Sequence, residues 1–561
     1  MKKHTLLFFT VLFGLILAIL GLRIHNDTWY LLALGRAIAA DGLTLEDPIL
    51  MNLGYPIVDQ QWLYALGLWK VFSLSGLWGI YVLSVVAGFL TIILFYRIAC
   101  LLSEKNDMIP YLLTTIVGLL YGYLDIVIRP WVFSNLFFMV EVYLLEHYVR
   151  EKKVNLLLPL PFLSVLLINI HGALWPFMLI LLLPYLAEAL LPECEFSFCL
   201  PARGFPKSPL VLCFFTCLLF GFINPYGLDL MLYSIHTMGI GRSFQLVTEV
   251  RPFSIQSYFG VFTLFVAGWL FFCLSRQKTY VRYLLLSLGT FFMMLIALRS
   301  RQQFLLFGCL PLAWLCRGFS LTQARAFLRH HIDPVIFSMF SLLLLFLEII
   351  NIHNMHMLRH FSTGLLIPAC LLGAALFLIS LCFFYQHLFS FRWKVVCLLT
   401  CIFFGLLPLA AAPGFDMTRI TDSKNNAEFS FLRHEMSRNP AEVRLYTDFN
   451  SSAMAEYIGF RPLIDTRPEV RAGFMTHGFD YWQEFYDVQT GSLDPLTYLD
   501  KYSIEYVLVR DNDICYSYLN RPEAKAFWSL IYDKYGCRIY KRTQKQRAAE
   551  IASTETSDNR W

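Results

Sequence analysis

The chain has 561 residues, of which 57% are hydrophobic and only 15% are charged. A soluble globular protein carries about 25% charged residues, so this composition excludes an ordinary soluble fold and indicates a polytopic membrane protein. The net charge of +5 says little by itself, because orientation in a membrane depends on where Lys and Arg lie. No nucleic-acid partner is expected.

Apolar runs long enough to cross a bilayer recur along the first three quarters of the chain. The first run resembles a signal peptide, but it is long and no small-residue cleavage site follows, so we expect a retained helix. About 13 transmembrane helices are predicted, at 5–22, 76–102, 108–127, 131–149, 154–170, 173–191, 209–223, 257–275, 280–297, 302–316, 334–350, 362–386 and 394–412.

Up to residue 412, lysine lies mainly in alternate connections between these runs. One set of connections holds every Lys of this part of the chain except Lys70, which lies in the other set. The positive-inside rule places the lysine-bearing set in the cytoplasm. An odd helix count then places the N-terminus inside and the residues after 412 outside, in a multi-pass membrane protein.

The first outer loop, residues 24–60, is the longest connection in the early part of the chain. Residues 28–40 have helical spacing with Trp and Tyr, which prefer the headgroup level. We expect a helix in the membrane interface there, ended by Gly42, and a second surface helix or re-entrant helix at 58–76.

Several short motifs occur in a fixed order along nearly the whole chain. They are D-x-W-x5-G-R-x-I from Asp27, D-P at Asp47, Q-W-L at 61–63, RPWVFS at 129–134, NIHG at 169–172, NPYG at 224–227, SRQQFLLF at 300–307 and PLIDTRPE at 462–469. With the amphipathic first loop and the C-terminal soluble part, they resemble GT-C-type polytopic membrane glycosyltransferases, and more closely a group of uncharacterised bacterial GT-C-like membrane proteins. Such enzymes take a sugar from a polyprenyl-phosphate carrier.

The resemblance implies a role for the first-loop acid. Asp27 matches the position that acts as base toward the acceptor or helps to hold a divalent cation (Mg²⁺ or Mn²⁺) on the carrier phosphate, and Asp47 is a second catalytic candidate. Glycosyl transfer needs a base and a group that stabilises the departing phosphate, a task suited to Arg. The substrate-binding candidates are Arg129, His171, Arg251, Arg299 and Arg301. No metal ligand is assigned.

Each candidate also has a structural explanation. Asp27 is a plausible helix N-cap, Asp47 before Pro48 a turn former, and Asp59 a cap of the second loop helix. Arg129 and Arg299 are placed to snorkel. The remaining alternatives are that His171 is a satisfied buried histidine and that Asp125 pairs with Arg129 at helical i, i+4 spacing.

After residue 412 the composition becomes that of a soluble domain. Residues 413–545 are predicted to form an extracytoplasmic α/β domain with a mostly parallel sheet, and 546–561 a disordered tail. Strands are expected at 443–449, 461–467, 504–510 and 537–542, and helices at 451–459, 493–502 and 523–535. Asp465 and Arg467 fall at a strand end, where they suit either a ligand or a mutual ion pair. Cys515 and Cys537 are candidates for a disulfide.

Three functions remain open. The first is a glycosyltransferase moving a sugar from a polyprenyl-phosphate carrier in the lipid bilayer to an extracytoplasmic glycan, lipid or protein. The second is a non-catalytic GT-C-like protein that binds lipid-linked glycan or scaffolds envelope assembly; Asn26, where many such enzymes have another acid, favours it. The third is a transporter or flippase, which would predict inverted repeats and midplane polar residues that the sequence does not show clearly.

Overall fold

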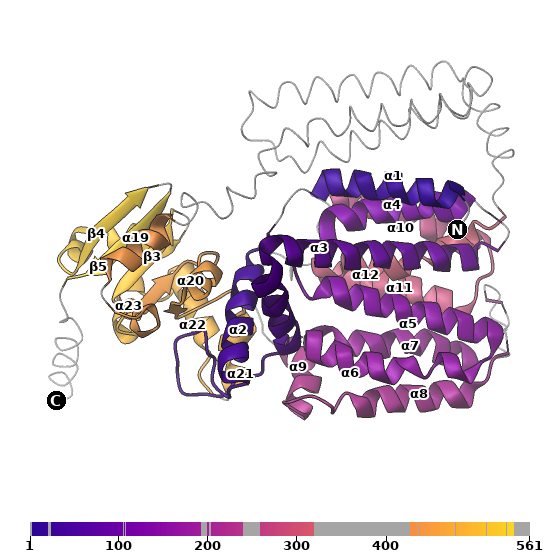
Figure 1. Ribbon diagram of the computed structural model, residues 1–561, viewed down its shortest axis with the longest axis horizontal. Helices are drawn as coiled ribbons and strands as arrows, with labels where there is room; N and C mark the ends of the chain where they lie inside the picture. Colours follow the sequence, from indigo (N-terminus) through magenta and orange to yellow (C-terminus); the bar gives the residue numbers. More distant parts are fainter. Residues whose placement is uncertain are drawn as a thin grey trace, which may run out of the picture.

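The computed structural model describes residues 3–20, 24–104, 106, 108–191, 199–200, 204–238, 258–318, 427–436, 438–476, 478–511, 513–534 and 536–543. The predicted spans at 334–350, 362–386 and 394–412 lie outside these residues, as do Arg251 and the tail at 546–561. The described residues form a helical bundle joined to a C-terminal unit that contains a β-sheet (Figure 1).

The bundle consists of apolar helices that lie side by side in Figure 1. Every predicted span that falls on described residues coincides with helical structure. The elements are α1 (Lys3–Leu20), α3 (Trp62–Leu102), α4 (Met108–Asp125), α5 (Trp131–Glu151), α6 (Pro159–His171), α7 (Trp175–Leu190), α8 (Lys207–Phe220), α10 (Tyr258–Arg276), α11 (Val281–Ile296), α12 (Arg301–Gln303), a π-helical turn (Phe304–Gly308) and α13 (Pro311–Leu315).

The outward faces of the bundle show what surrounds it. Along α8, Leu212, Phe215 and Leu219 are each more than half exposed. A continuous apolar stripe of this kind is costly in water and is satisfied by lipid. Within the described residues, Trp62–Leu102 and Val154–Leu190 are helical stretches long and apolar enough to cross a membrane. The chain is a membrane protein.

Two breaks in the helices separate spans from loop structure. α3 bends at Gly76, where φ is +63°, so that its first part is distinct from the span that follows. Between α6 and α7 the backbone leaves helical geometry at His171 (φ −155°, ψ 73°) and passes through a short 3-10 turn (Gly172–Leu174). A further helix, α9 (Leu228–Met238), follows NPYG and was not predicted.

The first outer loop forms a helical cover at one end of the bundle. α2 (Asp27–Asp41) ends at Gly42, as expected, and lies beside the first part of α3 across the direction of the bundle helices (Figure 1). The two helices touch where α2 has Gly35: a Cβ there would lie 2.0 Å from the carbonyl oxygen of Ala65. The motif glycine is therefore required by close backbone approach.

This contact leads to a prediction. Gly35→Ala is expected to destabilise the folded protein by about 1–3 kcal/mol, because backbone atoms must move to admit the methyl group. Gly67→Ala is the matched control, since no atom lies within 4 Å of its Cβ position and Ala is the better helix former. Thermal unfolding of both variants in detergent measures the difference, and equal melting temperatures would contradict the predicted clash.

The C-terminal unit has a five-stranded sheet in the order β2-β1-β3-β5-β4. The strands are β1 (Arg444–Thr447), β2 (Arg461–Pro462), β3 (Tyr506–Arg510), β4 (Trp528–Lys534) and β5 (Cys537–Arg542). The helices are α19 (Ala427–Glu435), α20 (Ser452–Ile458), α21 (Gly473–Thr476), α22 (Tyr481–Thr490), α23 (Pro495–Lys501), α24 (Ile514–Leu519) and α25 (Pro522–Lys525); short 3-10 turns lie at Pro440–Glu442 and Pro468–Arg471.

Two expectations about this unit were wrong. Residues 523–535 form not one helix but the short α25 followed by β4, which pairs with β5 as an antiparallel hairpin. Gly536 (φ +72°) supplies the turn between the two strands. The second wrong expectation was a mostly parallel sheet. The sheet is mixed, because β1 is parallel to β2 and β3 whereas β5 is antiparallel to β3 and β4. Cys515 and Cys537, the candidates for a disulfide, are free thiols.

Candidate functional site

Asp27 and Arg129 form an ion pair at the end of the bundle that carries the first outer loop. Asp27 is the first residue of α2, and Arg129 lies in the link between α4 and α5. The guanidinium of Arg129 also lies over the Trp131 ring, 4.4 Å from its centroid. The D-x-W and RPW motifs, about one hundred residues apart, therefore meet in one contact. Asp27 is not the N-cap, since that position is Asn26.

The second oxygen of the Asp27 carboxylate faces His25, whose Nδ1 is 3.6 Å away. Burial raises the pKa of Asp27, but the charges of Arg129 and His25 outweigh it and leave the pKa below its ordinary value. The side chain of Asp27 is 17% exposed and that of Arg129 is 10% exposed. Asp27 is therefore an ionised carboxylate at neutral pH that solvent still reaches.

A second ion pair lies near the first. Arg301, at the start of α12, contacts Asp125, at the end of α4, with an Nη2–Oδ1 distance of 3.4 Å. Because α4 ends at Asp125, the expected i, i+4 spacing of Asp125 and Arg129 on one helix was wrong. Beside this pair, Asn135 donates to Gln302 at 2.8 Å. Two buried atoms lack a hydrogen-bond partner among the described residues: the Nε of Arg301, which is a donor, and the Oδ1 of Asn135, which is an acceptor.

The other predicted binding residues differ in their surroundings. His171 is buried, and its Nδ1 lies 2.9 Å from the hydroxyl of Ser134, as in the structural explanation for a buried histidine. Arg299 is exposed in the 3-10 turn Leu298–Ser300. Arg251 lies outside the described residues.

The Q-W-L and NIHG motifs also meet. Trp62 donates its indole N–H to the side chain of Asn169 at 3.0 Å. The backbone of Gly172 donates to the Gln60 carbonyl at 2.9 Å, and that of Ala173 to the Gln60 side chain at 2.9 Å. Four of the motifs that carried the sequence resemblance thus meet in two pairs at this end of the molecule, although they lie far apart in the chain.

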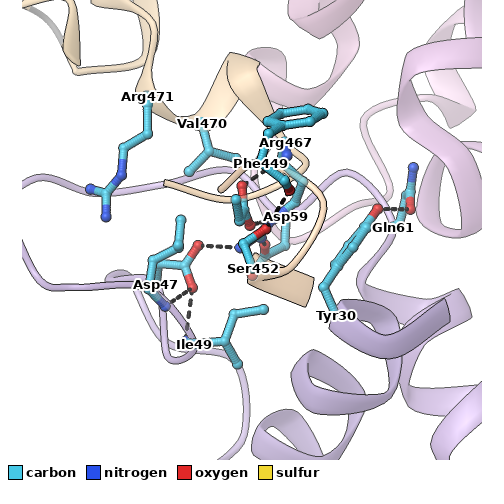
Figure 2. Close-up of polar contacts among 12 residues, drawn as sticks. Tyr30, Asp47, Ile49, Asp59, Gln61, Phe449, Ser452, Arg467, Val470 and Arg471 are labelled. Atoms are coloured by element: carbon cyan, nitrogen blue, oxygen red, sulfur yellow. Dashed lines mark hydrogen bonds and ion pairs between the residues drawn. The ribbon is translucent and has the colours of Figure 1, made fainter. Parts of the chain in front are cut away.

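Arg467 of the C-terminal unit is bound to acids of the first outer loop (Figure 2). Its guanidinium donates to Asp465 at 2.6 Å, Asp47 at 2.8 Å and Asp59 at 3.4 Å. The other oxygen of Asp47 accepts from the backbone of Ile49 at 2.9 Å, as in a turn former. Asp47 is therefore satisfied on both oxygens, and its contacts anchor the loop.

Asp59 is the acid of this group with the most unusual protonation. Burial, followed by the charge of Asp47, raises its pKa from 3.8 to about 7, and Arg467 only partly offsets these effects. α3 begins at Trp62, and the Asp59 side chain binds Arg467 instead of capping that helix. Sequence reasoning singled out Asp465 and Arg467 as a pair and missed their link to the loop.

The carboxylates at this end do not fit a divalent cation well. Asp27 is neutralised by Arg129, and Asp47, Asp59 and Asp465 share Arg467. In the described part of the chain, no three His, Cys, Asp or Glu side chains are arranged to hold a metal ion. The chemistry below is therefore derived from the side chains alone.

No family model matches the chain, and no curated protein matches it. Among solved structures it is similar to ArnT from Cupriavidus metallidurans bound to undecaprenyl phosphate, at 10% identity and a TM-score of 0.48, over 96% of this chain and 98% of that one. It is also similar to the Archaeoglobus fulgidus oligosaccharyltransferase in the apo form, at 11% identity and a TM-score of 0.48, over 97% and 75%.

Proposed function

We propose that this chain is a membrane glycosyltransferase that moves a sugar from a polyprenyl-phosphate carrier to an acceptor on the outer side of a bacterial cell membrane. The observation that carries the proposal is the Asp27–Arg129 pair. It joins an ionised, solvent-accessible carboxylate to an arginine at the end of an apolar bundle. The lysine pattern supports an outer location for this end and for the C-terminal unit.

The pair suits both halves of glycosyl transfer. The Asp27 carboxylate accepts the proton of the acceptor hydroxyl as that oxygen attacks the sugar carbon. The bond from that carbon to the carrier phosphate breaks, and its electron pair goes to the phosphate oxygen. Arg129 stabilises the resulting negative charge without losing its own proton. Because the two groups touch, both events occur within one ligand's width.

Arg301 is the second proposed phosphate ligand. Its buried Nε and the neighbouring Asn135 Oδ1 have no hydrogen-bond partner among the described residues, and buried polar atoms of this kind are normally satisfied by a ligand or water. Arg299 is assigned to the same anionic ligand, and Arg251, outside the described residues, stays a predicted ligand of it. His171 and Asp47 are proposed to stabilise the site without touching the ligand. His171 acts through its hydrogen bond with Ser134, and Asp47 acts through its ion pair with Arg467.

Asn26 gives the non-catalytic alternative its support. Where many GT-C enzymes have another acid, the Asn26 amide donates to the carbonyl of Asn450 at 2.6 Å, a purely structural contact. A protein of this kind would bind a polyprenyl phosphate without transferring its sugar. The two functions are therefore separated by measuring binding and transfer on the same variants.

The binding measurement uses undecaprenyl phosphate as the probe, detected by native mass spectrometry of the protein released from detergent. Arg129→Gln and Arg301→Gln are each expected to weaken binding about tenfold or more, because a charge-assisted contact contributes about 1.5–3 kcal/mol. Arg317→Gln, whose guanidinium lies over Trp314, is the control and is expected to bind as the wild type does. Unchanged binding in both site variants would contradict the proposed phosphate site.

A further inference from the structure

The first turn of α2 is held from two sides. On the bundle side, Asp27 pairs with Arg129, and the Thr28 hydroxyl donates to the Ile128 carbonyl at 3.2 Å. On the side of the C-terminal unit, the Asn26 amide donates to the Asn450 carbonyl. The position of Asp27 therefore depends on both parts of the molecule.

Farther along α2, the same unit makes contact through α20. Arg36 donates to the Tyr457 carbonyl at 2.8 Å, and the Trp29 and Tyr457 rings lie 4.9 Å apart. Ala453 of α20 belongs to the same hydrophobic cluster as Leu31 and Leu32. This apolar contact orients α2 as a whole but leaves the loop that follows it to be fixed by other residues.

Arg467 fixes that loop. It is only 7% exposed, and the acids it binds in the loop, Asp47 and Asp59, lie at two well-separated points of the segment 42–61. Its guanidinium also lies over the Tyr30 ring, 5.1 Å from the centroid. Tyr30 stands three residues after Asp27 on α2, and its hydroxyl donates to Gln61 at 2.9 Å. One side chain thus touches α2 and both ends of the loop.

We propose that Arg467 is a positioning residue for the Asp27–Arg129 pair: it fastens the loop 42–61 and α2 to the C-terminal unit and so fixes the site from the outer side. The proposal rests on the proposed function insofar as the pair is catalytic. Arg suits this task better than Lys, because its planar fork contacts several carboxylates at once while its face covers a ring.

The charges around Arg467 make this fastening dependent on pH. The groups that face it are Asp47 and Asp59 from the loop, Asp465 and Glu469 from the segment after β2, Glu456 from α20, Tyr30 from α2 and Tyr233 from α9. Tyr226 faces Asp59 and Asp47. Burial raises the pKa of Asp59, and the neighbouring acids Asp47 and Asp465, which outnumber the single arginine, raise it further.

The test is hydrogen exchange of the full-length protein in nanodiscs without substrate. The amide of Met51 reports on the fastened loop, since it donates to the Pro462 carbonyl at 3.0 Å. Arg467→Gln is expected to raise its exchange rate about tenfold or more. Arg467→Lys is expected to give a smaller rise. Arg438→Gln, an arginine of the same unit in an exposed pair with Glu505, is the control and is expected to leave the rate unchanged.

A double substitution separates fastening from general damage. If Arg467 acts through Asp47, then Asp47→Asn with Arg467→Gln raises the Met51 rate no more than the larger single effect. Additive effects, or an unchanged rate in Arg467→Gln, would overturn the proposal. Failure of the glycosyltransferase proposal has a different result. In that case Asp27→Asn would retain sugar transfer, while Arg467→Gln would still raise the exchange rate of Met51.

The raised pKa of Asp59 gives a further prediction. The closed loop holds a proton on Asp59 that the open loop releases, so closure is most favourable below about pH 4 and weakens as pH rises to about 7. After correction for intrinsic exchange, the wild-type Met51 rate is expected to rise between these values and level off above them. Asp59→Asn is expected to reduce the rise, and the part that remains is expected from Glu456 and Glu469, whose pKa values burial also raises. An unchanged rise in that variant would show that Asp59 does not contribute to the pH dependence.

Discussion

Asp27→Asn is expected to lower sugar transfer about 100-fold or more while the protein remains in the membrane at its normal level. General-base catalysis by a positioned side chain contributes about 10²–10⁴-fold, and Asn keeps the shape of Asp while it cannot take up a proton. The measurement is the amount of modified envelope glycan, by mass spectrometry, in cells whose only copy of the protein is the variant. Asp41→Asn, an exposed residue at the other end of α2, is the matched control.

The pH profile separates a catalytic Asp27 from a structural one. Arg129 and His25 keep the pKa of Asp27 below its ordinary value, so wild-type transfer is expected to stay constant as pH falls and to decline only below the usual Asp range. Removing the positive charge in Arg129→Gln is expected to move this decline to higher pH. A decline at the same pH in both proteins would show that Asp27 is not the group being titrated.

The local elements of this protein follow from its sequence because they rest on short-range patterns. Apolar runs predicted the positions of the bundle helices, and the helical spacing of residues 28–40 followed by Gly42 predicted α2. The same reasoning failed at 523–535, where Glu, Ala and Lys favour a helix. There the partner strand β5 decides the outcome through pairing, and a local pattern does not contain that contact.

The contacts of the candidate site were less predictable. Asp27 and Arg129 were both singled out, but the sequence offered Asp125 as the nearer partner for Arg129. Arg467 was assigned to Asp465, two residues away, while its loop partners lie about 400 positions earlier in the chain. Ion pairs of this kind are set by how the helices and the C-terminal unit pack together. Only the order of the motifs indicated that distant segments belong to one site.

The buried cluster around Arg282 is a case in which local spacing indicates the wrong partner. Glu146 and Arg150 lie one helical turn apart on α5, a spacing that favours a pair. In the structure Glu146 accepts from the Nε of Arg282 at 3.1 Å, and Glu188 of α7 binds the same guanidinium. All three side chains are at most 1% exposed. One arginine therefore joins α5, α7 and α11 in the interior of the bundle.

Arg282→Met is expected to destabilise the protein by about 3–5 kcal/mol, because it leaves two buried carboxylates without their cation. Thermal unfolding in detergent measures the loss. Lys153→Met is the control: Lys153 binds Glu151 in an exposed pair, and such pairs contribute only about 0–1 kcal/mol.

A triple variant tests whether the loss comes from uncompensated charge. Arg282→Met combined with Glu146→Gln and Glu188→Gln removes the two orphaned carboxylates together with the arginine, so it is expected to recover most of the lost stability. Equal instability of the single and triple variants would mean that the shape and hydrogen bonds of the guanidinium hold these helices together. Recovery would instead identify electrostatic neutrality as the reason that this buried region needs Arg282.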